Sequence, residues 1–132
     1  MSFFQLKTPK DLQKLLETSE REPVFLLKHS SQCSISAEVH AEYSEFDRQL
    51  GADRPCSFAL VLVIEERSLS NQVAGELGVE HKSPQLLLIS NSKVIWHDSH
   101  WRLTLEKMNE VADRYLQHRT KPEKPQARDN EF

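Results

Sequence analysis

The chain has 132 residues, which is the usual length of one domain with one core. Apolar residues make up 38% and charged residues 28%, a balance typical of a globular chain rather than a disordered one. The formal net charge is -3 with both signs interspersed, so there is no basic stripe for phosphates and we expect no nucleic acid partner.

The N-terminal residues and the apolar runs argue against export and against a membrane span. Residues 1–10 hold a few apolar side chains but no basic region followed by a long apolar stretch, so no signal peptide is expected. The longest apolar run, Phe58–Ile64, is much shorter than the ~20 residues of a membrane helix. We therefore expect a cytoplasmic protein with no membrane association.

Helices and strands are expected to alternate along the chain. Continuous apolar runs predict buried strands, and apolar residues three or four apart predict helices. Thr8 is a suitable N-cap for the first helix, with Pro9 at its first position. In chain order we expect an edge strand at Phe3–Gln5, a helix from Thr8, a strand at Val24–Leu27, a helix at Ser34–Leu50 closed by Gly51, a strand at Phe58–Ile64, a helix at Ser68–Leu77 capped by Ser68 and closed by Gly78, strands at Leu86–Ile89 and Val94–Trp96 joined by a turn at Asn91-Ser92, and a helix at Leu105–His118.

This order predicts an α/β fold with a mixed sheet of four or five strands and helices on both faces. Strands joined through helical crossovers are expected to pair in parallel, and the last two strands to form an antiparallel hairpin. The domain is expected to span residues 1–119. Residues 120–132 are almost entirely polar and are predicted to form a disordered tail.

Cys33 is the candidate reactive residue. It follows a buried strand and opens an amphipathic helix, which places it at the end of the sheet where α/β folds bind ligands. Unpaired N–H groups and the helix dipole at that position favour an anion, so they favour the reactive thiolate. Lys28 and His29 precede the cysteine and are candidates for additional positive potential beside it.

The motif around this cysteine is Cys33-Ser34-Ile35-Ser36, in which Ser36 stands where a Cys-x-x-Cys pair has its second thiol. A serine oxygen can hydrogen-bond a thiolate but cannot form a disulfide, so an outside thiol must release any mixed disulfide on Cys33. Cys56 precedes a parallel strand and is expected at the opposite end of the sheet, roughly 20 Å away. Disulfide Cα atoms lie within ~7 Å, so Cys56 is predicted to be a bystander.

Chance and packing offer simpler explanations for several of these features. A Cys-x-x-Ser motif occurs by chance in many chains, and most lone cysteines are inert core residues. Three histidines, at positions 81, 97 and 100, lack the spacing of a metal site, so no metal is expected. Trp96 and Trp101 are interpreted as packing residues.

Several blocks of sequence together resemble the monothiol bacilliredoxins, a family of the thioredoxin-like superfamily. These blocks, which fall between about Pro23 and Leu116, are Phe25-Leu26-Leu27-Lys28-His29-Ser30, Cys33 with Ile35-Ser36, Arg67-Ser68-Leu69-Ser70-Asn71, His81-Lys82-Ser83-Pro84-Gln85, and Trp96-His97 with Ser99-His100. In thioredoxin folds the proline at the place of Pro84 is cis and faces the active cysteine. The sequence itself leaves the isomer of the Ser83-Pro84 bond open.

The resemblance implies a monothiol thiol–disulfide oxidoreductase that removes bacillithiol, a small cellular thiol, from client proteins. Cys33 would take the bacillithiol from the client's mixed disulfide, and free bacillithiol would then regenerate Cys33. Pro84 and the backbone of Ser83 would hold the incoming disulfide. The family usually has proline directly after the cysteine, whereas this chain has Ser34, which adds an N–H donor at that position.

Two other functions remain open from the sequence. The protein could be a non-catalytic redox sensor or adaptor, in which modification of Cys33 changes a partner contact without turnover. A general dithiol thioredoxin is a third hypothesis, but Ser36 removes the second thiol unless a partner protein provides one.

Overall fold

The computed structural model describes residues 3–120, with side chains described for residues 3–116. Within residues 3–120, no helix is long and apolar enough to cross a membrane. The elements are β1 (Phe4–Leu6), α1 (Pro9–Thr18), β2 (Val24–His29), α2 (Ser34–Leu50), β3 (Ser57–Leu62), α3 (Arg67–Leu77), β4 (Gln85–Ser90), β5 (Lys93–Ser99), the 3-10 turn η1 (His100–Arg102) and α4 (Leu105–Thr120).

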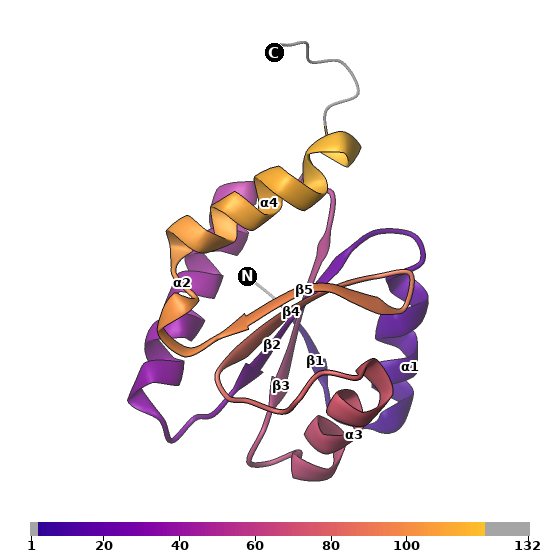
Figure 1. Ribbon diagram of the computed structural model, residues 1–132, viewed down its shortest axis with the longest axis vertical. Helices are drawn as coiled ribbons and strands as arrows, with labels where there is room; N and C mark the ends of the chain where they lie inside the picture. Colours follow the sequence, from indigo (N-terminus) through magenta and orange to yellow (C-terminus); the bar gives the residue numbers. More distant parts are fainter. Residues whose placement is uncertain (1–2, 121–132) are drawn as a thin grey trace.

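The five strands form one mixed sheet in the order β1-β3-β2-β4-β5. Strand β3 runs parallel to both β1 and β2, whereas β4 runs antiparallel to β2, and β5 runs antiparallel to β4. Helices α2 and α4 lie on one side of this sheet, and α1 and α3 lie on the other (Figure 1). The predicted mixed sheet with helices on both faces is confirmed, including the edge strand, which occupies Phe4–Leu6.

One part of the predicted topology was wrong. We expected parallel pairing across every helical crossover, but the strand that follows α3 is antiparallel to β2. Strand β4 enters the sheet beside β2 rather than beside β3, so its direction is not fixed by a right-handed β-α-β crossover.

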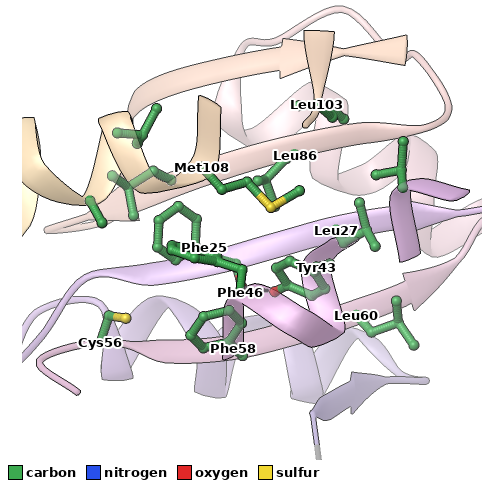
Figure 2. Close-up of a cluster of buried hydrophobic side chains, with 14 of the residues drawn as sticks. Phe25, Leu27, Tyr43, Phe46, Cys56, Phe58, Leu60, Leu86, Leu103 and Met108 are labelled. Atoms are coloured by element: carbon green, nitrogen blue, oxygen red, sulfur yellow. Dashed lines mark hydrogen bonds between the residues drawn. The ribbon is translucent and has the colours of Figure 1, made fainter. Parts of the chain in front are cut away.

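Alternate residues of β2 pack into two separate hydrophobic cores. Phe25 and Leu27 face α2 and α4, where they meet Tyr43 and Phe46 in the larger core (Figure 2). Leu26 faces the opposite way and belongs to the smaller core with residues of α1 and α3. A strand buried on both faces is the pattern expected from the continuous apolar run in its sequence.

Local signals explain several element ends. The Thr8 hydroxyl accepts a hydrogen bond from the N–H of Asp11, and the Asp11 carboxylate accepts one from the N–H of Thr8, which is a capping box. Gly78 ends α3 in the left-handed conformation. Asn91 and Ser92 both have positive φ, as the predicted tight hairpin turn requires.

Several predicted boundaries differ from the structure. Helix α3 begins at Arg67 with Glu66 as its N-cap, so the prediction of Ser68 as the cap was wrong. Strand β3 ends at Leu62 rather than Ile64, while β2 and β5 continue beyond the predicted strands to His29 and Ser99. Helix α4 continues to Thr120, and the rest of the predicted tail lies outside the described residues.

Candidate functional site

Cys33 is the N-cap residue of α2, at the edge of the sheet where β2 ends. Its backbone is extended, its side chain makes no capping hydrogen bond, and it is partly exposed. The first turn of α2 carries no acidic residue, so no carboxylate in that turn opposes an anion at the helix N-terminus. The unpaired backbone N–H groups of that turn favour an anion at this position.

Ser36 anchors the loop that carries Cys33. The Ser36 side chain is fully buried, and its Oγ accepts a hydrogen bond of 2.9 Å from the N–H of Ser30. The same oxygen lies 2.9 Å from Nδ1 of His29. The hydrogen bonds of Ser36 thus go to the segment before the cysteine and not to Cys33 itself, so we assign it an indirect influence on the thiol. Ser34, the other predicted supporting residue, is exposed at the first position of α2.

His29 contributes less positive charge to this loop than the sequence suggested. Burial, followed by the neighbouring His40, lowers the pKa of His29 below its ordinary value, and the two ring centroids lie 4.7 Å apart. The lowered pKa favours the neutral form of His29. Its neutral ring can accept or donate at Nδ1 toward Ser36, according to its tautomer.

Lys28 lies on the other face of the sheet, between β2 and α3. Its side chain is fully buried, and its Nζ donates to Nδ1 of His81 at 3.0 Å, while the Ser70 hydroxyl lies 3.4 Å from the same nitrogen. Burial lowers the pKa of Lys28 to about 8. Because neighbouring residues of a strand point to opposite faces, Lys28 and His29 do not act together beside the cysteine.

The Ser83–Pro84 peptide bond is cis and lies at the same edge of the sheet as the Cys33 loop. This placement follows from the register, in which Gln85 at the start of β4 pairs with Lys28 near the end of β2. Pro84 is buried, and its carbonyl oxygen accepts a hydrogen bond of 3.1 Å from the N–H of His100. The Ser83 hydroxyl is buried without a hydrogen-bond partner among the described residues.

Cys56 lies at the opposite edge of the sheet, as predicted. It directly precedes β3, whose first residue, Ser57, pairs with Val24 at the start of β2. Six residues of strand separate that edge from the Cys33 loop, which is roughly 20 Å. Cys56 is 3% exposed, and burial raises its pKa to about 12 (Figure 2). Both cysteines are free thiols.

Trp101 does not pack into the core, so its interpretation as a packing residue was wrong. It is 71% exposed on η1, whereas Trp96 is partly buried against the larger core, as expected. Trp101 lines a groove of about 410 Å³ between η1 and α2, which includes Ile35, two residues beyond Cys33. Sequence periodicity did not identify this groove because η1 is an irregular turn.

Among the side chains of residues 3–116, no group of three or more His, Cys, Asp or Glu side chains is arranged to hold a metal ion. The three histidines considered in the sequence lie apart. His81 contacts Lys28, His100 contacts Ser99, and His97 lies on the edge strand β5.

Residues 4–108 match the sequence profile of a family described as "Monothiol bacilliredoxin BrxC". The chain belongs to the monothiol bacilliredoxin family. This finding confirms the resemblance drawn from the sequence blocks.

Solved structures with similar folds support the same conclusion about architecture. A thioredoxin-fold protein described as a candidate oxidoreductase is 25% identical, covers 82% of this chain and 91% of its own, and has a TM-score of 0.70. Thioredoxins of Fasciola hepatica and Schistosoma mansoni are 17% and 16% identical, each with a TM-score of 0.68. They cover 85% and 87% of this chain, and 98% and 99% of their own. The protein has a thioredoxin fold, and its family and fold together support a redox enzyme.

Proposed function

We propose that this bacilliredoxin removes bacillithiol from protein mixed disulfides, with Cys33 as the nucleophile. The observation that carries the proposal is the position of Cys33 as a partly exposed N-cap of α2, with the second cysteine buried at the far edge of the sheet. A thiol in this position can attack a disulfide but has no partner thiol within reach.

The reaction proceeds in two exchanges, each of which breaks one S–S bond and forms another. The Cys33 thiolate attacks the bacillithiol sulfur of the client's mixed disulfide, and the client sulfur leaves as a thiolate that takes a proton from solvent. Cys33 now carries bacillithiol. The thiolate of a second bacillithiol attacks the bacillithiol sulfur on Cys33, which releases the Cys33 thiolate and oxidised bacillithiol.

The other site residues serve this reaction in different ways. Ser36 orients the 30–33 loop through its hydrogen bonds to His29 and Ser30. Ser34 supplies a backbone N–H at the start of α2, where the family usually has proline. A helix N-terminus favours an anion, so this extra donor favours the Cys33 thiolate. Ser83 and Pro84 hold the incoming disulfide beside Cys33.

The co-substrate in this proposal is bacillithiol, the partners are bacillithiolated client proteins, and no metal takes part. We place the reaction in the cytoplasm, where low-molecular-weight thiols keep protein thiols reduced. Each exchange consumes one thiol and one disulfide and forms one of each, so the protein reduces nothing overall. The oxidised bacillithiol that accumulates must therefore be reduced by a separate enzyme.

The test is the intact mass of the protein after incubation with oxidised bacillithiol and then with a bacillithiolated client. Wild type is compared with Cys33→Ser and Cys56→Ser. The proposal expects one bacillithiol on Cys33 in wild type and in Cys56→Ser, with release of free client thiol by both. An unmodified Cys33, or equal release of the client by Cys33→Ser, contradicts it.

A redox sensor or adaptor is the second candidate, and the isolation of Cys33 from any other thiol favours it. Without a resolving thiol, a modified Cys33 persists until an external thiol arrives. In the same experiment a sensor would take up one bacillithiol but release no more client than Cys33→Ser does.

A further inference from the structure

The groove between η1 and α2 adjoins the proposed catalytic edge of the sheet. One wall is formed by α2 from Ile35 onwards and the other by residues His100 to Thr104. The N–H of His100 binds the carbonyl oxygen of Pro84, so the second wall is tied to the loop proposed to hold the disulfide. A volume of about 410 Å³ lies in the range of small-molecule sites.

Two side chains in this groove are open to contact with a ligand. Trp101 exposes 71% of its surface to solvent, so the face of its indole ring is open to a stacking partner. Glu38 is exposed on α2 and has no ion pair or hydrogen bond with any side chain in residues 3–116. The other glutamate of the groove, Glu42, is already engaged, since its Oε1 accepts a hydrogen bond of 2.5 Å from the N–H of Leu105.

The position of Glu38 relative to Cys33 suits the near half of a bacillithiol molecule. Bacillithiol is a cysteine with a free amine, joined to a glucosamine ring that carries malate. Its ammonium is therefore close to the sulfur, and the sugar ring is the next group along. Glu38 lies five residues beyond Cys33, about 7 Å along the helix axis, and Trp101 stands on the facing wall.

We propose that this groove binds the bacillithiol moiety during exchange, with Glu38 pairing with its ammonium and Trp101 stacking on the apolar face of its sugar ring. The malate end extends past Trp101 into solvent. This inference rests on the proposed function and adds to it the residues that distinguish bacillithiol from other thiols. A stack on an indole and a carboxylate–ammonium pair would select an amino-sugar thiol over a plain alkyl thiol.

The test compares the rates at which three disulfides modify Cys33, measured by intact mass. Oxidised bacillithiol carries both the amine and the sugar, cystine carries the amine alone, and hydroxyethyl disulfide carries neither. Trp101→Ala is expected to lower the ratio of the bacillithiol rate to the hydroxyethyl rate by about three- to tenfold, and Trp101→Phe by less. Glu38→Gln is expected to lower the rates of both amine-bearing disulfides about two- to fivefold, an effect that fades in 0.5 M salt.

Matched controls are Ile95→Ala, an exposed apolar side chain on β5, and Glu17→Gln, an exposed carboxylate on α1; neither should change any ratio. If Trp101→Ala and Glu38→Gln leave the ratios at the wild-type values, or slow all three disulfides equally, the groove is not the binding site. A wild-type protein that shows no preference for bacillithiol over hydroxyethyl disulfide also contradicts the groove as the binding site. A wild-type Cys33 that takes up no bacillithiol, or a client that is released equally by Cys33→Ser, contradicts the proposed function instead, so the two failures are distinguishable.

Discussion

Replacing Ser36 with alanine tests whether its buried hydroxyl holds the cysteine loop in place. The substitution removes two hydrogen bonds of 2.9 Å, one to the N–H of Ser30 and one to Nδ1 of His29. At about 1 kcal/mol for each bond, we expect the free energy of unfolding to fall by about 2 kcal/mol. With an unfolding entropy of ~2.1 cal/mol/K per residue, the corresponding fall in Tm is roughly 7 °C.

The assay is urea unfolding followed by circular dichroism, with Ser34→Ala as the matched control. Ser34 is exposed at the start of the same helix, so its substitution should change the unfolding free energy by less than about 0.5 kcal/mol. The reasoning is refuted if Ser36→Ala is as stable as Ser34→Ala, because the loop would then not depend on the buried hydroxyl. An unchanged slope of the urea dependence would show that both variants unfold from equally compact states.

Three further outcomes follow from buried groups. Tyr43→Phe should lower the free energy of unfolding by about 1–3 kcal/mol in urea melts, because the phenol is fully buried and lies within hydrogen-bond distance of both the N–H and the carbonyl oxygen of Ala59. The pKa of Lys28 is about 8 in the folded protein and near 10.4 when unfolded, so the unfolded state holds more protons between these values and stability rises with pH. Urea melts from pH 7 to 10.5 should therefore show wild type gaining roughly 3 kcal/mol relative to Lys28→Met, and parallel pH dependences would contradict this. Iodoacetamide at pH 8 should add a single carbamidomethyl group to the native protein, on Cys33, and a second on Cys56 only after denaturation, as read by intact mass.

The elements of the fold could be predicted because their signals are local. The capping residue Thr8 and the apolar stripe of α2 each depend on a few neighbouring residues, and the structure has both where they were expected. The direction of β4 could not be predicted in this way, since it depends on which strand it joins in the sheet. The cap of α3 was misplaced because serine favours both the cap and the first helical turn, and Glu66 takes the cap position without a side-chain hydrogen bond.

The part of the candidate site that could be predicted from the sequence is the part whose place in the fold depends only on the order of strands and helices. Cys33 follows a strand and precedes a helix, and this order placed it at the sheet edge without any knowledge of its contacts. The partners of Ser36 were not predictable, because they depend on how the loop from His29 turns back over the helix. The exposure of Trp101 was missed for a related reason, since η1 has no periodic pattern that indicates which side chains point outward.

The distance between the two cysteines determines how this protein responds to oxidation. Cys33 and Cys56 lie at opposite ends of the paired strands β2 and β3, so the native chain cannot form an intramolecular disulfide. Oxidation must therefore add mass to the protein or join it to another molecule, and it cannot shorten any loop or tighten the fold. The oxidised state is consequently set by the concentrations of surrounding thiols and disulfides, so the fraction of capped Cys33 reports on the composition of the thiol pool rather than on an internal equilibrium of the protein.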